Sequence, residues 1–188
     1  MLRAIATIAA GLQLAQPMTD TSAMRIAEHL SALAVEHSID PLTLVAMGWH
    51  ESRWLPASKL VRGDEEYVGV FQIRLRNFDD CQGSLLTGPC DTVRRSLEDW
   101  RYNVALAARY ITINRGYCHD TIGSARLPEW LASFGGFNRI ARPGRVTPGD
   151  RACGREATRR GWRTLPLAKA VVSVIEFRAG LIRRLTDE

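Results

Sequence analysis

Residues 38–58 read SIDPLTLVAMGWHESRWLPAS, and this stretch decides how the chain is interpreted. Asp40 followed by Pro41 is typical of a helix start, because aspartate caps the free N–H groups and proline fits the first turn. The apolar residues that follow recur at helical spacing. They predict a helix that ends near Ser52 and carries a glutamate, Glu51, in its last turn.

Glu51 is expected on the apolar strip of this helix, because Leu44 and Met47 precede it by seven and four residues. Burial and the negative helix end both disfavour a carboxylate, so its pKa should be raised. A glutamate that stays protonated near neutral pH can act as a general acid. Trp49 and Trp54 could then serve as aromatic platforms for sugar rings. The alternative is that Glu51 pairs with Arg53 or caps the following loop.

Helical periodicity extends along most of the chain, which predicts a mostly α fold in a single domain. Residues 54–67 are expected to be a loop, with one small β-hairpin near residues 60–75. The segment SLEDW matches a capping box, in which Ser96 and Asp99 open a helix that runs to about Asn114. Further helices are expected after Thr21 or Ser22, in LPEWLASFGGF and from Thr164 onward, with an extended loop over residues 138–163.

The composition narrows the class of protein. A chain of 188 residues, 46% of them hydrophobic, is long enough for one domain with a core and is not disordered. No apolar run is long enough to span a bilayer, so no integral membrane span is expected. The net charge of +5 suits an anionic partner such as nucleic acid, lipid headgroups or a cell-wall polymer.

The four cysteines and the N-terminal residues give indications of the cellular compartment in which the protein acts. Cys81, Cys90, Cys118 and Cys153 lack the spacing of metal pairs. Two disulfides, Cys81–Cys90 and Cys118–Cys153, would indicate an oxidising compartment; the alternative is four thiols in a cytosolic protein. Residues 1–19 form a weak secretory signal or N-terminal extension, or else an amphipathic first helix.

The stretch TLVAMGWHESRWLPAS resembles the catalytic segment of the soluble lytic transglycosylases, which are similar to goose-type lysozyme. A second family motif is matched by GVFQI, which ends in Gln72 and Ile73. A third is matched by NVALAARYI, which supplies Asn103 and Tyr110. The fourth, Tyr-Asn-x-Gly, aligns with LASFGGFNR, where Phe134 replaces the family tyrosine and cannot donate its hydrogen bond.

The resemblance covers about residues 20–140 and implies a lysozyme-like transglycosylase domain over residues 20–188. Glu51 would cleave the β-1,4 bond between N-acetylmuramic acid and N-acetylglucosamine, first as acid and then as base, to leave a 1,6-anhydro ring. Ser52, Gln72, Asn103, Tyr110 and Phe134 would line or support the substrate site. The family implies a monomer without cofactor that acts on peptidoglycan in the periplasm or outside the cell, and a phage-encoded origin stays open.

Other readings stay open. A hydrolytic muramidase would need a second carboxylate, for which Asp64, Glu65 and Glu66 are candidates. A wall-binding or assembly protein could keep the fold with weak catalysis, as Phe134 suggests. A basic module for nucleic acid would rest only on the arginines of residues 139–163, without a motif, so no nucleic-acid partner is expected. Metal is not expected either, since Trp54 stands where a zinc-binding His-Glu-x-x-His helix needs its second histidine.

Overall fold

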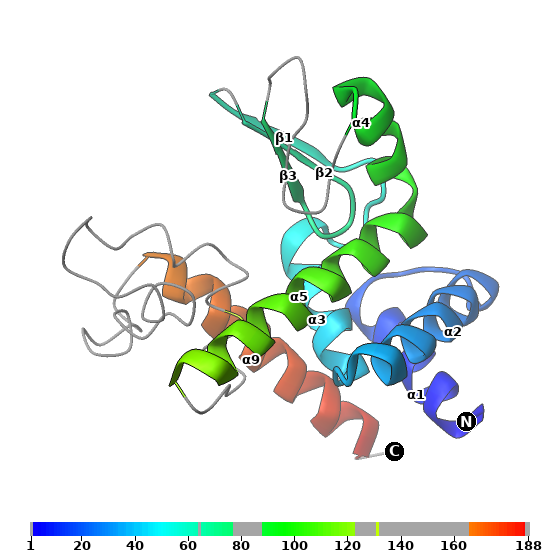
Figure 1. Cartoon of the computed structure of the whole chain (residues 1–188). Coiled ribbons are helices and arrows are strands. Elements are labelled where there is room, and N and C mark those ends of the chain that lie inside the picture. Colours follow the sequence, from blue (N-terminus) through cyan, green and yellow to red (C-terminus); the bar gives the residue numbers. More distant parts are fainter. Residues whose placement is uncertain (1, 64, 77–87, 123–130, 132–165, 187–188) are drawn as a thin grey trace. The chain divides into compact units, whose positions relative to one another are not determined.

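The computed structural model describes residues 2–63, 65–76, 88–122, 131 and 166–186 (Figure 1). The described chain is mostly helical with one small antiparallel sheet, which confirms the mostly α class. Its helices are α1 (Leu2–Ala15), α2 (Asp20–His37), α3 (Pro41–Ser52), α4 (Cys90–Glu98), α5 (Trp100–Ile122) and α9 (Pro166–Thr186). None of these described helices is both long and apolar enough to cross a membrane.

The chain divides into two compact units. The first comprises residues 1–108 and 180–188, and the second comprises residues 109–179. Helices α5 and α9 each contribute residues to both units. Glu51 and the whole sheet belong to the first unit, which therefore carries the candidate site.

The helical core of the first unit begins with α1, which packs against α2 and α3. Ile5, Ile8 and Leu12 of α1 are buried. Gly11 lets α3 approach closely, because a Cβ atom there would lie 3.1 Å from a methyl group of Leu42. This packing is what an amphipathic first helix requires, whereas a role of residues 1–19 in export stays a prediction.

The two helices before the site begin with side-chain caps. Helix α2 starts two or three residues earlier than expected, because Thr19 rather than Thr21 or Ser22 accepts a hydrogen bond from a backbone N–H of the first turn. The start of α3 is as predicted: Asp40 accepts from the Thr43 N–H at 2.9 Å, and Pro41 is the first helical residue. The position of Glu51 in the last turn therefore follows from local sequence signals.

The sheet has three antiparallel strands in the order β1-β2-β3, namely Lys59–Arg62, Glu65–Val68 and Ile73–Arg76. The hairpin expected near residues 60–75 thus gains a third strand, and the loop expected over residues 54–67 is wrong from residue 59 onward. Strand β2 alternates buried and half-buried residues. Its buried side contacts α4, so the sheet has an inner and an outer face.

The junction of α4 and α5 differs from the expected capping box. Ser96 lies within α4, where its hydroxyl donates to the Thr92 carbonyl oxygen at 3.1 Å. Asp99 instead takes an extended conformation, and its carboxylate accepts from the Arg101 N–H at 2.8 Å. Asp99 therefore ends one helix and caps the next, and the expected single helix from Ser96 is wrong.

Candidate active site

Glu51 lies in the last turn of α3, where the residue as a whole is half-buried. Burial raises the pKa of its carboxyl group from 4.5 to about 7, and the positive charge of Arg62 acts in the opposite direction. None of the salt bridges in the described part of the chain involves Glu51. The raised pKa is as the sequence predicts, and the alternative pairing with Arg53 does not occur.

The turn that follows Glu51 is fixed by an unusual backbone. Arg53 and Trp54 both have left-handed φ angles, of +57° and +58°, a conformation that costs non-glycine residues about 1 kcal/mol or more each. The indole N–H of Trp54 donates to the Val45 carbonyl oxygen at 3.0 Å. The ring lies against Gly48, where a Cβ atom would come within 2.7 Å of it. Trp54 thus holds the turn against α3 and compensates for the strained backbone.

Trp54 does not form the expected sugar platform, and Trp49 is partly covered. Trp54 is only 5% exposed, and it makes an edge-to-face contact with Phe71. Trp49 is half-buried, and the guanidinium of Arg53 stacks 3.6 Å from its ring centroid. Because Trp54 belongs to the core and Arg53 covers a face of Trp49, the platform prediction is wrong for Trp54 and unsupported for Trp49.

Ser52 closes the same turn. Its buried hydroxyl accepts from the Leu55 N–H at 3.2 Å and donates to the Gly48 carbonyl oxygen at 3.5 Å. The chain then bends back, since the Ser58 N–H donates to the Leu55 carbonyl oxygen. Ser52 therefore stabilises the backbone beside Glu51. Its hydroxyl group is engaged by the hydrogen bonds with Leu55 and Gly48.

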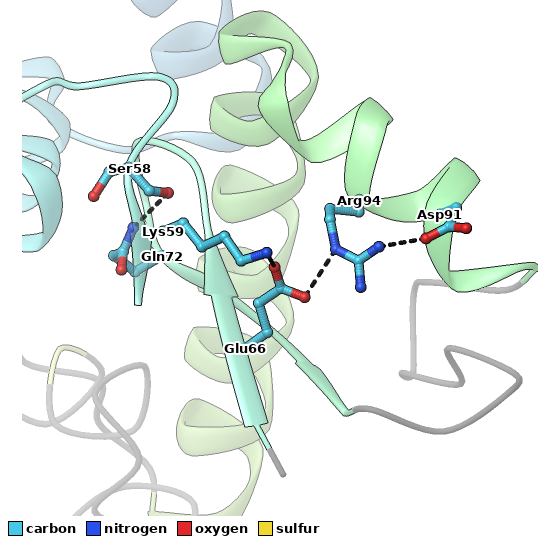
Figure 2. A network of polar contacts seen from close by, with 6 residues as sticks. All are labelled: Ser58, Lys59, Glu66, Gln72, Asp91 and Arg94. Carbon is cyan, nitrogen blue, oxygen red and sulfur yellow. Dashed lines mark hydrogen bonds and ion pairs between the residues drawn. The ribbon is translucent and has the colours of Figure 1, made fainter. Parts of the chain in front are cut away.

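Gln72 ends a tight turn that starts at Gly69. Its side-chain nitrogen donates to the carbonyl oxygens of Ser58, at 3.2 Å, and Gly69, at 2.8 Å. Figure 2 shows the Gln72 amide directed at the Ser58 backbone. Gln72 has a φ of +48°, which its own side-chain bonds help to stabilise. Its amide nitrogen is thus occupied in joining the turn after α3 to the end of the sheet.

Asn103 secures that turn from the side of α5. It is fully buried, and its amide nitrogen donates to the Val68 and Leu97 carbonyl oxygens at 2.9 and 3.1 Å. Its amide oxygen accepts from the Phe71 N–H at 2.8 Å. Gly69 is required here, because it has a φ of +79° and a Cβ atom would lie 2.2 Å from the Asn103 amide. The burial leaves Asn103 no surface for the expected direct contact with substrate, so its role is to position the Gly69–Gln72 turn.

The remaining expected substrate residues belong to other parts of the chain. Tyr110 is half-buried on α5, in the second unit. Phe134 lies outside the described residues. The roles of Tyr110 and Phe134 in the substrate site therefore stay predictions.

Two of the candidate second carboxylates, Glu65 and Glu66, are held by basic side chains. Glu65 accepts from the Tyr67 hydroxyl at 2.7 Å and forms an ion pair with Arg74. Glu66 is buried on the inner face of the sheet, 2.5 Å from the Lys59 ammonium and 2.8 Å from Nε of Arg94 (Figure 2).

Burial opposes ionisation of Glu66, but the hydrogen bonds and charges of Lys59 and Arg94 outweigh it and lower the pKa of this carboxyl group. Arg94 continues the network to Asp91 at 2.5 Å. Glu66 is therefore a structural anion between the sheet and α4. Asp64, the third candidate, lies outside the described residues.

The cysteine and metal expectations are tested only in part. Cys90, the first residue of α4, takes part in a disulfide bond. Cys81, Cys153 and the side chain of Cys118 lie outside the described residues, so both pairings stay predictions. Within the described ranges, no group of three or more His, Cys, Asp or Glu side chains is placed to hold a metal ion.

Arg62 is the residue near the site that sequence reasoning missed. It is exposed at the end of β1, and its charge acts on Glu51 although eleven positions separate them. Motif spacing gives no signal for this residue. Only the strand register, in which Arg62 faces Glu65, could have indicated its place on the outer face of the sheet.

These observations describe a mostly helical protein with one small sheet. The unit that contains the sheet also carries a half-buried glutamate of raised pKa at the end of a helix. Comparisons of the chain with models of known families, with curated proteins and with solved structures give no match.

Proposed function

We propose that this chain is a lytic transglycosylase that cleaves peptidoglycan, with Glu51 as its general acid and base. The observation that carries the proposal is the pKa of about 7 for a carboxyl group at the end of α3. Such a group is substantially protonated at neutral pH and can give up and recover a proton. The resemblance of residues 43–58 to the catalytic segment of these enzymes supplies the substrate class.

In the proposed reaction, the protonated Glu51 donates its proton to the glycosidic oxygen as the bond to the muramic acid C1 breaks. The acetamido oxygen of the substrate stabilises the positive charge that develops at C1. Glu51 then accepts the proton of the C6 hydroxyl, whose oxygen bonds to C1 and closes the 1,6-anhydro ring. One carboxyl group suffices, because it returns to its protonated state at the end of the cycle.

The fixed helix end supports this role. Hydrogen bonds of Ser52 and Trp54 hold the turn after Glu51 without engaging its carboxyl group. The acid is thereby positioned by its backbone, which is what efficient proton transfer to a bound sugar requires. Action on peptidoglycan in the periplasm or outside the cell, as a monomer, belongs to the same proposal.

A hydrolytic muramidase is the second candidate, but its support is weaker. An inverting hydrolase needs a second carboxylate that activates water. Glu65 and Glu66 are both bound to basic side chains, and the pKa of Glu66 is lowered. Glu66 is in addition only 2% exposed, so it is poorly placed to act on a water molecule.

Mass spectrometry of peptidoglycan digested with the purified protein tests the proposal. We expect muropeptides that end in 1,6-anhydromuramic acid. Reducing muramic acid ends would support the hydrolase instead. If the protein releases neither product but sediments with purified sacculi, a wall-binding protein with weak or no catalysis becomes the better interpretation.

A further inference from the structure

The outer face of the sheet carries charged and aromatic side chains from all three strands. Strand register places Arg62 opposite Glu65, and Tyr67 opposite both Leu60 and Arg74. Cross-strand partners share a face, so these five residues form one surface. Glu66 and Val68, which alternate with Glu65 and Tyr67 along β2, belong to the buried inner face.

Two of the positive side chains on the strands, Lys59 and Arg74, are neutralised locally. On the outer face, Arg74 forms an ion pair with Glu65. On the inner face, Lys59 forms an ion pair with Glu66. Arg62 differs, because it makes no salt bridge to any residue in the described part of the chain.

The position of Arg62 is defined even without an ion pair. Its guanidinium lies 5.9 Å from the ring centroid of Tyr67, within range of a cation–π interaction. Tyr67 is itself held by the hydrogen bond from its hydroxyl to Glu65. An exposed guanidinium held in this way retains N–H donors for a carboxylate, which it can bind through two parallel hydrogen bonds.

We propose that Arg62 binds a carboxylate of the glycan substrate next to Glu51, and so favours strands that carry anionic substituents over neutral glycan. This inference rests on the proposed function, since it assigns a specificity residue to the same site. Its basis is an exposed guanidinium that packs against Tyr67 and forms no salt bridge with a described residue, and whose charge acts on the acid.

Two carboxylates of peptidoglycan could be the ligand. Strands that carry peptides present the carboxylates of the peptide, while the lactyl group of the muramic acid is tied up in an amide bond. Strands freed of peptide by an amidase present the lactyl carboxylate itself. Chitin oligosaccharides present neither and retain the acetamido sugars, so they serve as the neutral reference.

The test measures binding rather than turnover, in the full chain with Glu51→Gln to prevent cleavage. Dissociation constants are determined for the three glycans with Arg62, Arg62→Gln and Arg62→Lys. Arg25→Gln is the matched control, because Arg25 is also an exposed arginine and lies on α2. Thermal melting of each variant verifies folding, which an exposed position should not affect.

We expect Arg62→Gln to weaken binding of at least one carboxylate-bearing strand about three- to tenfold and to leave chitin binding unchanged. The strand affected identifies the carboxylate, and Arg62→Lys should restore part of the loss. Equal losses for all three glycans, or no loss beyond that of Arg25→Gln, would overturn the role of Arg62 alone. If the Arg62-containing parent binds none of the glycans, the proposed function itself fails.

Discussion

The end of α3 and the inner face of the sheet each hold a glutamate that protein atoms cover, yet the two are driven to opposite protonation states. Burial raises the pKa of Glu51 to about 7, since Arg62, the one described basic residue that acts on it, lowers the pKa less than burial raises it and forms no salt bridge with it. Glu66 is at least as inaccessible, but Lys59 and Arg94 contact its two oxygens and lower its pKa.

The comparison shows that contacts with basic groups, and not burial alone, decide what a covered carboxyl group can do. Glu66 has its negative charge compensated on both oxygens, so it stabilises the junction of sheet and α4. Glu51 lacks such a partner and can exist in both protonation states near neutral pH. Of the two regions, the end of α3 is therefore the one suited to proton transfer.

The largest effect is expected from Glu51→Gln, which keeps the shape of the side chain but removes the transferable proton. Release of muropeptides from sacculi should fall by about 10²- to 10⁴-fold, as is typical for general acid–base residues. Glu66→Gln should retain far more activity per folded molecule, because Glu66 is assigned no proton transfer. Initial rates under identical conditions measure both. Full activity of Glu51→Gln would remove the basis of the proposed mechanism.

The second-largest effect is expected in the pH dependence of folding stability, which should distinguish Glu51 from Glu66. The folded-state pKa of Glu51, about 7, lies above its ordinary value of 4.5. The folded state therefore binds more protons between these pH values, and wild-type stability falls as pH rises through that window. Glu51→Gln does not titrate, so it should be more stable than wild type above pH 7, by at most about 3 kcal/mol.

Urea unfolding at pH 4, 6 and 8 measures this difference. The advantage of Glu51→Gln should be absent at pH 4, partial at pH 6 and complete at pH 8. Glu98→Gln, which removes an exposed carboxyl group on α4, is the control. An advantage that is the same at all three pH values would show that burial of the charge is not its cause.

Glu66→Gln should destabilise the first unit by about 1–3 kcal/mol at neutral pH, because it leaves two basic groups without their anion. The cost is limited, since Lys59 is half exposed and Arg94 retains Asp91. The lowered pKa of Glu66 contributes stability above its unfolded value, which is lost as pH falls through the folded value. The stability deficit of Glu66→Gln in urea unfolding should therefore shrink in acid. Its sign is opposite to that of Glu51→Gln, which should be more stable than wild type.

The region around Glu51 could be predicted because its signals are local. Asp40 and Pro41 fix where α3 begins, and the spacing to Leu44 and Met47 places the glutamate on an apolar strip. The cost of desolvation then follows from elementary electrostatics. The opening of the helix and the direction of the pKa shift thus needed no knowledge of the tertiary structure.

The region around the sheet could not be predicted in the same way, because its contacts join distant residues. Asn103 resembles a site residue in its motif, yet the carbonyl groups of Val68 and Leu97 occupy its amide. Trp54 resembles a sugar platform, but its indole is drawn to the Val45 carbonyl oxygen. Side chains that serve a fold and those that serve a ligand have the same chemistry, and only burial and partners distinguish them.

The smallest effect is expected from Arg62→Gln in the active enzyme. This variant tests directly how a nearby positive charge changes the pKa of Glu51. Arg62 lowers the pKa of Glu51, since a nearby positive charge favours the carboxylate. Its removal should raise that pKa, so the loss of activity with rising pH should shift to higher pH. Added salt should reduce the shift, because Arg62 is exposed to solvent.

Profiles of kcat/KM against pH for wild type, Arg62→Gln and Arg62→Lys measure this shift. Arg62→Lys keeps the positive charge and should retain most of the wild-type profile, and Arg25→Gln should not move it. A fall in kcat/KM without a change in the profile would mean that Arg62 affects substrate binding without acting on Glu51. A shift to lower pH would contradict the assignment of Glu51 as the acid that Arg62 influences.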